Sequence, residues 1–242
     1  MTTKVVPGLL IAAPDPEQAA KEAAHRMARA TREAIGTRGR AAIALSGGST
    51  PRRAYELLAK DPKVDWSRVN TFLVDERAVP PTDPRSNYRM VKEALLDRAG
   101  VQEDHVFRMR AESSDLEDAA REYEALIKKH VPKGAFDLIV LGVGEDGHTA
   151  SLFPGRPEVE ITDRLVVAVP AHEGREPRLT IAPPVIEAAR HVMILAFGKA
   201  KHEPLERVWE VSGSAKDTPA RVVRGARGTI CWVIDRAAGG MG

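Results

Sequence analysis

The feature of this sequence that most restricts its fold is a series of short, nearly unbroken apolar runs. Two of them, Ala41–Leu45 and Phe136–Val143, show no alternation between apolar and polar residues. Strands have this composition when helices cover both faces of a parallel sheet. Segments with helical spacing, such as Leu116–Ile127, lie between the runs. This alternation predicts a three-layer α/β/α fold, in which a doubly wound, mostly parallel, Rossmann-like sheet carries helices on both faces.

The length of 242 residues suits one α/β domain over residues 1–242, with a core at about 8–234 and a frayed tail at 237–242. Further apolar runs predict strands at 5–13, 69–74, 105–109, 165–169, 178–182, 191–197 and 229–234. Helical patterns predict helices from residue 16 towards residue 39 and at 51–60, 86–98, 115–127, 184–190 and 200–211. The proline-rich segment 154–184 is the least regular, and we expect a lid or a small excursion from the core there.

Composition excludes several classes of protein. Lys and Arg total 36 and Asp and Glu total 34, so the net charge is +2, whereas nucleic-acid-binding domains carry a clear basic excess. No run is long and apolar enough to span a membrane, and the run at 5–13 is broken by Pro7 and Gly8. The single cysteine, Cys231, allows no disulfide within the chain, which suits a reducing cytoplasm. We expect a cytoplasmic monomer, because no long exposed apolar stripe calls for a partner subunit.

Four predicted strands end in segments rich in glycine, charge or hydroxyl groups. These segments are Ser46–Thr50, Asp75–Arg77, Gly142–Thr149 and Gly198–Lys199. In open α/β sheets, ligands bind beyond the carboxyl ends of the strands. We therefore expect all four segments to face one crevice.

The first segment, Ser46-Gly47-Gly48-Ser49-Thr50, joins a strand to a helix that Pro51 is expected to open. Paired glycines permit positive φ angles and a close backbone approach. Free amides at a helix N-terminus, with two hydroxyl groups beside them, form an anion site. The alternative is a tight turn in which Thr50 caps the helix. The lysine and spacing of a Walker loop are absent.

The second segment places Asp75 and Arg77 at the end of an apolar strand, and Ser86 and Asn87 follow before a helix. A charged triplet at this place is often only a solvated loop, and Ser86 or Asn87 can serve as a helix cap. The position at a strand end favours a functional role for Asp75 and Arg77.

The third segment matches the dinucleotide fingerprint G-x-G-x-x-G, but it lies in the middle of the chain, and Glu145 and Asp146 would repel a pyrophosphate. His148 follows Asp146 by two residues, so the carboxylate can orient the imidazole as a general base. The alternative is a surface histidine that caps a turn. Asp75, Asp146 and His148 could also bind a metal, but we expect none, because cationic residues are at hand for the same work.

The fourth feature is a pair of cations, Arg178 at the start of one strand and Lys199 after another. Both can be solvated at strand ends. In a crevice with an anion loop they can hold a phosphate, Arg178 by a bidentate fork and Lys199 as a point charge.

Together these segments resemble the signature segments of the 6-phosphogluconolactonase family. The resemblance lies in Ser46–Pro51, in Asp75–Arg77 with Arg85–Asn87, and in Gly142–Pro154, with later matches at Arg178–Thr180 and Gly198–Ala200. It runs from about residue 8 to 234. It implies a fold shared with glucosamine-6-phosphate deaminase and ribose-5-phosphate isomerase, no cofactor, and hydrolysis of 6-phosphoglucono-δ-lactone to 6-phosphogluconate in the oxidative pentose phosphate pathway.

Two alternatives stay open. The first is a glucosamine-6-phosphate deaminase or aldose–ketose isomerase, but the family resemblance implies a glutamate five residues after the histidine in the deaminase, where this chain has Phe153, and a tyrosine where it has Arg77. The second is a non-catalytic sugar-phosphate-binding module, which has no need for His148 beside Asp146.

The sequence therefore predicts a catalytic set of three residues: His148 as the base on water, Asp146 to orient it, and Arg77 to stabilise the oxyanion or grip sugar hydroxyls. The residues expected to bind the sugar phosphate are Ser46, Gly47, Gly48, Ser49, Thr50, Asp75, Arg77, Asn87, Gly147, Arg178 and Lys199.

Overall fold

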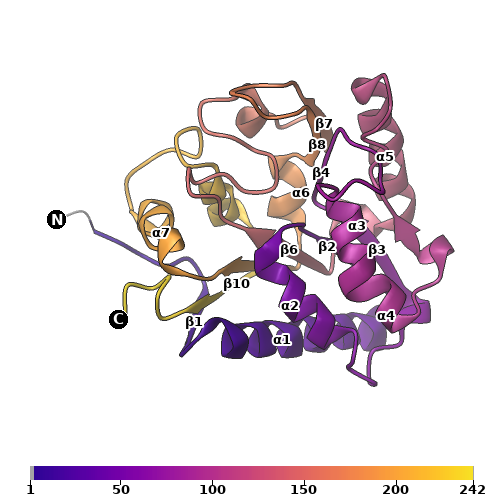
Figure 1. Ribbon diagram of the computed structural model, residues 1–242, viewed down its shortest axis with the longest axis horizontal. Helices are drawn as coiled ribbons and strands as arrows, with labels where there is room; N and C mark the ends of the chain where they lie inside the picture. The colour runs from indigo at the N-terminus through magenta and orange to yellow at the C-terminus, as the bar shows by residue number, and fades with distance from the viewer. Residues whose placement is uncertain (1–2, 242) are drawn as a thin grey trace.

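Seven parallel strands form the central sheet of the computed structural model, which describes residues 3–241 (Figure 1). Their order across the sheet is β1-β10-β9-β6-β2-β3-β5. The strands are β1 (Leu9–Ala13), β2 (Ala41–Leu45), β3 (Val69–Leu73), β5 (Val106–Phe107), β6 (Leu138–Gly142), β9 (His191–Ala196) and β10 (Thr229–Asp235). Strand β1 lies at one edge; the chain then runs from β2 through β3 to β5 at the other edge and returns through β6 and β9 to β10, beside β1. The predicted doubly wound parallel sheet is thus confirmed.

Helices cover both faces of this sheet. One face carries α1 (Pro16–Arg38), α2 (Ser49–Leu58) and α3 (Asn87–Val91), which continues through a π-helical turn, Lys92–Leu96, into α4 (Asp97–Ala99). The other face carries α5 (Leu116–His130), α6 (Pro183–Ala188) and α7 (His202–Trp209).

Alternation along β2 explains how one strand serves both layers. Ile43 and Leu45 belong to the apolar cluster under α1 and α2. Ala42 and Ala44 belong to the cluster under α5 and α6. Because both clusters are apolar, the strand reads in the sequence as one unbroken apolar run.

Capping residues set the ends of the long helix α1. The Asp15 side chain accepts a hydrogen bond of 2.8 Å from the amide of Gln18, and Pro16 is the first helical residue. Gly39 ends the helix in the left-handed conformation, with φ +78°.

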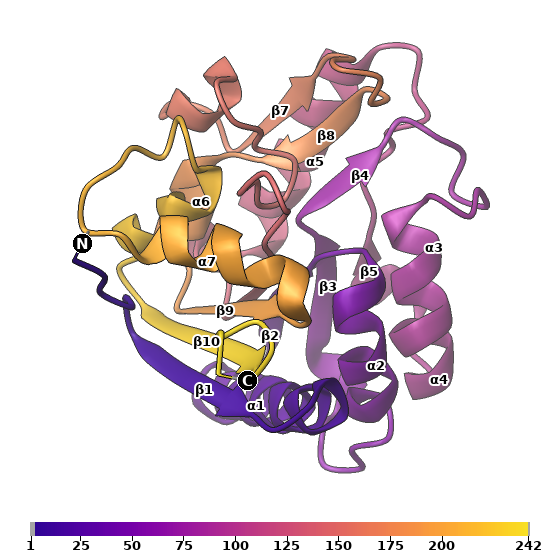
Figure 2. The same cartoon turned by 60° about the vertical axis from the view of Figure 1, so that its left-hand side comes forward.

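A second, antiparallel sheet of three strands is the main departure from the expected fold. It has the order β4-β8-β7, from β4 (Asp75–Arg77), β8 (Arg178–Ile181) and β7 (Val166–Val169). The runs at 165–169 and 178–182 were expected as strands of one sheet, and the charged triplet as a segment after a strand. Figure 2 shows the three strands gathered beside α5, at the top of the view.

Val74 connects the two sheets and forms a backbone hydrogen bond with a strand of each. Its amide donates to the carbonyl oxygen of Leu45 at 3.0 Å, and its carbonyl oxygen accepts from the amide of Ile181 at 2.8 Å. The chain thus leaves the parallel sheet after β3 and enters the small sheet at Asp75 without a turn. As a result, the strands β7 and β8 of the irregular segment 154–184 form an excursion from the core, in which β8 pairs with β4, the strand directly after β3.

Within the C-terminal tail, where we expect fraying at 237–242, Ala238 is held in place. Ala238 is fully buried, and its amide donates to Asp235 Oδ1 at 2.8 Å. Residue 242 lies outside the described residues.

Within residues 3–241, no helix combines the length and apolar character needed to cross a membrane.

Candidate active site

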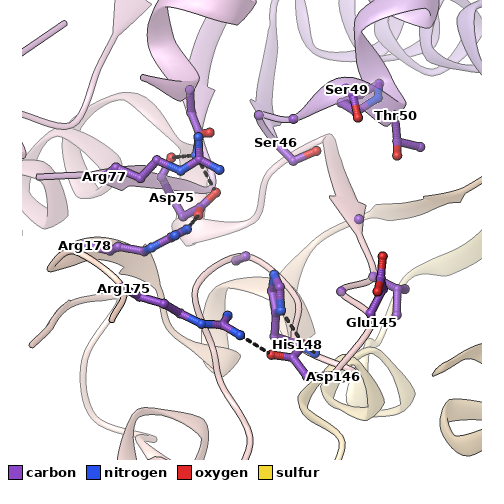
Figure 3. A pocket seen from close by; sticks show the side chains of 18 of the residues that line it. Ser46, Ser49, Thr50, Asp75, Arg77, Glu145, Asp146, His148, Arg175 and Arg178 are labelled. Carbon is purple, nitrogen blue, oxygen red and sulfur yellow. Dashed lines mark hydrogen bonds and ion pairs between the residues drawn. The ribbon is translucent and has the colours of Figure 1, made fainter. Parts of the chain in front are cut away.

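The polar strand ends meet at a cavity of about 530 Å³ (Figure 3). It lies at the carboxyl ends of β2 and β6 and is closed on one side by the small sheet. Among the predicted site residues, those that line it are Ser46, Gly47, Gly48, Ser49, Thr50, Asp75, Arg77, Asn87, Asp146, His148 and Arg178. Gly147 and Lys199 do not line it, and Glu145, Arg175 and Lys201 do. Three of the four segments thus converge on one crevice as expected, whereas neither residue of the fourth, Gly198–Lys199, lines it.

The glycine turn brings bare backbone to the cavity. A Cβ on Gly47 would lie 1.9 Å from Asn87 Oδ1, and Gly48 has φ +94°, so both positions need glycine. Helix α2 begins at Ser49, two residues before the start expected at Pro51, and Thr50 is not its cap. In the described chain no side chain caps this helix, so the amides of its first turn are open to a ligand.

Asp75 is a buried carboxylate with a partner on each oxygen. Its Oδ2 accepts from Ser151 Oγ at 2.6 Å and lies 3.9 Å from Arg178 Nη1, while Oδ1 accepts from Asn87 Nδ2 at 3.1 Å. Only 5% of the residue is exposed. These contacts fix the carboxylate at the cavity wall, where it can accept from a sugar hydroxyl.

The buried Glu76, next to Asp75, holds this part of the cavity wall in place; the sequence does not predict this role. Its carboxylate accepts from the amides of Arg77, Asn87 and Tyr88, each at 2.8 Å, and from Ser86 Oγ at 2.9 Å. Burial raises the pKa of Glu76, and these four hydrogen bonds oppose the rise. The carboxylate thereby ties β4 to the start of α3, the helix that Ser86 caps.

Arg77 is the last residue of β4, and its side chain lines the cavity on the same side as that of Arg178. One guanidinium nitrogen, Nη1, donates to the carbonyl oxygen of Arg85. Among residues 3–241, the buried Nε atoms of Arg77 and Arg178 have no hydrogen-bond partner. Burial lowers the pKa of Arg178 from its usual range. Both side chains therefore have donor capacity left for an anionic or hydroxyl-rich ligand.

His148 is held by Asp146, as the two-residue spacing predicts. Asp146 Oδ1 lies 2.5 Å from His148 Nδ1 and accepts from the His148 amide at 3.0 Å. Burial raises the pKa of Asp146, but the hydrogen bonds from His148 and the charge of Arg175 outweigh it and hold the pKa well below its usual range. An ionised carboxylate only accepts, so Nδ1 carries the hydrogen and the other ring nitrogen is left to accept a proton in the cavity (Figure 3).

The histidine loop has a shape that suits this pair and no dinucleotide. The Gly144 amide donates to the carbonyl oxygen of His148 at 2.8 Å, and the Gly147 amide donates to that of Gly144 at 3.0 Å. A Cβ on Gly144 would lie 2.1 Å from His148 Nδ1. The glycines close a tight loop around the imidazole, where a dinucleotide site would begin a helix.

Two side chains around the histidine were not expected as site residues. Arg175 Nη2 donates to Asp146 Oδ2 at 3.0 Å. Phe153 is buried, and its ring centroid lies 4.9 Å from that of His148. Arg175 has no motif of its own in the sequence, and its only signal is a basic residue three positions before Arg178.

The lysine on the cavity wall differs from the expected one. Lys199 is exposed, while Lys201 lines the cavity from the 3-10 turn Lys199–Lys201. Asp235 holds the start of this turn by accepting from the Gly198 amide at 3.0 and 3.1 Å. Because a 3-10 turn has three residues per turn, side chains two positions apart, such as those of Lys199 and Lys201, point in different directions.

In the described part of the chain, no three His, Cys, Asp or Glu side chains meet as a metal-binding group.

Comparison with known proteins agrees with this fold and site. Residues 14–232 match the family model described as glucosamine-6-phosphate isomerases/6-phosphogluconolactonase, and the chain belongs to this family. The 6-phosphogluconolactonase of Synechocystis sp. is 38% identical over 214 residues, which are 86% of this chain and 87% of the relative. A 6-phosphogluconolactonase structure from Shewanella baltica has a TM-score of 0.86 at 30% identity and covers 96% of this chain and 99% of its own.

The fold alone does not separate the two activities in the family description. The structure of a monomeric glucosamine-6-phosphate deaminase has a TM-score of 0.84 and covers 97% of this chain and 100% of its own, at 22% identity. The side chains around His148 have to make the distinction.

Proposed function

We propose that this chain hydrolyses 6-phosphoglucono-δ-lactone to 6-phosphogluconate, with His148 as the general base. The observation that carries the proposal is the imidazole clamped through Nδ1 by Asp146, with its other nitrogen facing a cavity lined by cations. The match to relatives named 6-phosphogluconolactonase supports the choice of lactone.

The phosphate of the substrate binds, in this proposal, at the start of α2. The uncapped amides of that turn and the hydroxyl groups of Ser49 and Thr50 supply donors, and the helix dipole favours negative charge. Arg178 supplies a guanidinium fork, and Lys201 takes the role that the sequence predicts for Lys199.

The reaction then needs one base and one oxyanion site. His148 removes a proton from water as the water oxygen bonds to the lactone carbonyl carbon. Arg77 stabilises the negative charge that develops on the carbonyl oxygen. When the bond to the ring oxygen breaks, His148 returns the proton to that oxygen, and the ring opens to the acid. Asp75 and Asn87 orient sugar hydroxyls.

Phe153 favours the lactonase over the deaminase. It occupies the position five residues after the histidine, is 2% exposed and packs against the imidazole. An isomerase that moves protons between neighbouring carbons needs a further proton-transfer group, and a phenyl ring cannot serve as one. Hydrolysis needs only the base that is present.

A His148→Ala variant tests the base. We expect kcat to fall about 10²- to 10⁴-fold when acid release from fresh lactone is corrected for spontaneous hydrolysis. The exposed His25→Ala is the matched control and keeps full turnover. Near-full turnover in His148→Ala would show that His148 is not the base.

For the phosphate site, we expect that Arg178→Ala raises KM far more than it lowers kcat.

We further propose that the protein is a cytoplasmic monomer that acts on a small sugar phosphate and has no nucleic-acid partner. The near-neutral net charge of +2 supports the last point.

A further inference from the structure

We propose that Arg175 is a positioning residue for the catalytic pair, through which the β7–β8 hairpin sets the orientation of Asp146 and His148. The inference rests on the proposed function, because it concerns the same site. Neither the family motifs in the sequence nor the mechanism above uses Arg175.

The first observation is that Arg175 completes a clamp on the Asp146 carboxylate. Asp146 Oδ1 accepts hydrogen bonds from His148 Nδ1 and from the His148 amide, and Asp146 Oδ2 accepts one of 3.0 Å from Arg175 Nη2. Among residues 3–241, Arg175 is the only arginine or lysine within ion-pair distance of Asp146. With a partner on each oxygen the carboxylate cannot rotate, so the imidazole keeps one direction.

The second observation is that Phe153 seats the guanidinium. Arg175 Cζ lies 4.6 Å from the ring centroid, a distance at which a cation and an aromatic face attract each other. The same buried ring contacts His148 at 4.9 Å. Arg175, Phe153 and His148 therefore form one packed group, in which the arginine is held at two points. Figure 3 shows Arg175 reaching across to Asp146.

The third observation is that the hairpin tip is built to present this arginine. The Arg175 amide donates to the carbonyl oxygen of His172 at 2.8 Å, and the turn between them uses Glu173 at φ +48° and Gly174 at φ +74°. The His172 ring also packs on Phe153, with centroids 4.5 Å apart. Both ends of the turn rest on the same phenyl ring, so the hairpin fixes where Arg175 points.

Several charged or titratable groups face the Asp146–His148 pair. They are Arg175, Arg178 and His172 from the β7–β8 part of the small sheet, Asp75 and Arg77 from β4, Lys201 from the turn before α7, and Glu145 from the loop itself. Arg175 is the one that bonds to the pair. Its positive charge helps to keep the Asp146 carboxylate ionised by lowering the pKa of that group.

Three variants separate this role from a purely structural one. Arg175→Met removes the charge and keeps the length, and Arg175→Lys keeps the charge but loses the planar fork. Arg164→Met is the matched control, because Arg164 is also near the small sheet, pairs with Glu124 at 3.2 Å and is equally exposed, 32% against 33% for the Arg175 side chain. Thermal midpoints of all three check folding.

For Arg175→Met we expect kcat for the lactone to fall about tenfold to hundredfold, with KM within about threefold of the wild type. We expect the acid limb of the kcat/KM profile to move to higher pH, because the site loses a positive charge. Arg175→Lys restores the acid limb and recovers kcat only in part. Arg164→Met keeps the wild-type kcat and the wild-type limb.

An unchanged kcat and acid limb in Arg175→Met would overturn the inference and leave the proposed function standing. A raised KM at unchanged kcat would also overturn it, because Arg175 would then bind substrate directly. A wild-type protein without lactonase activity would overturn the proposed function, and the inference with it.

Discussion

The substitution Gly144→Ala probes the catalytic geometry with a single added methyl group. The new Cβ would lie 2.1 Å from His148 Nδ1 and 2.7 Å from Asp146 Oδ1. Ordinary contact begins near 3.4 Å, so the imidazole has to retreat by about 1.3 Å, the difference between 3.4 and 2.1 Å. Gly144 does not have a positive φ, so an alanine there meets no backbone strain.

A displacement of this size is large for a general base. Misplacing a catalytic group by about 1 Å costs on the order of 10²-fold in rate, or about 2.7 kcal/mol in the barrier. We therefore expect kcat for the lactone to fall about a hundredfold. Overpacking lowers the free energy of unfolding by about 1 to 3 kcal/mol, less than the roughly 5 to 15 kcal/mol by which native domains are stable, so we expect the variant to fold at 25 °C.

The assay is acid release from fresh lactone in weak buffer, with urea unfolding as the measure of stability. Gly36→Ala in α1 is the control, since a Cβ there meets nothing within 4 Å, Gly36 does not line the cavity, and the change is expected to cost little in turnover. Wild-type kcat in a folded Gly144→Ala would refute the reasoning, because it would show that turnover does not need the imidazole where Asp146 holds it.

Two further predictions concern charge. The pKa of Glu124 falls to about 2 because, although burial raises it, hydrogen bonds from Lys128, Arg164 and the Leu165 amide prevail. The ionised carboxylate thus stabilises the fold above its ordinary pKa of 4.5 and loses this effect as the pH falls towards 2. Urea unfolding should show wild type above Glu124→Gln by about 1 to 2 kcal/mol at pH 6 and a gap that closes on acidification; a constant gap would contradict this. Lys201→Met should raise KM for the phosphorylated lactone about tenfold, whereas Lys199→Met should not; the reverse result would return the role to Lys199.

The layers of the fold could be predicted because they depend on local patterns. Runs such as Ala41–Leu45 are apolar on both faces, and Asp15 and Gly39 mark helix ends by their own chemistry. The small sheet could not be predicted in the same way. Asp75–Arg77 is too short and too charged to read as a strand, and it becomes one only by pairing with residues about a hundred positions later.

The candidate site divides along the same line. Asp146 and His148 are neighbours in sequence, so their pairing follows from a tight glycine loop. Arg175 meets them from 29 residues away, through the turn of a hairpin whose position depends on the whole small sheet. The choice between Lys199 and Lys201 depends on how a 3-10 turn leaves β9, which no residue type in the segment determines.

The most direct test of the central claim compares two lactones. Acid release is measured for freshly prepared 6-phosphoglucono-δ-lactone and for unphosphorylated gluconolactone, each corrected for spontaneous hydrolysis. We predict that kcat/KM is at least about a hundredfold higher for the phosphorylated lactone, because the first turn of α2, Arg178 and Lys201 are proposed to bind the phosphate, which the other lactone lacks. Equal values for the two lactones, or no rate above the spontaneous one, would contradict the account.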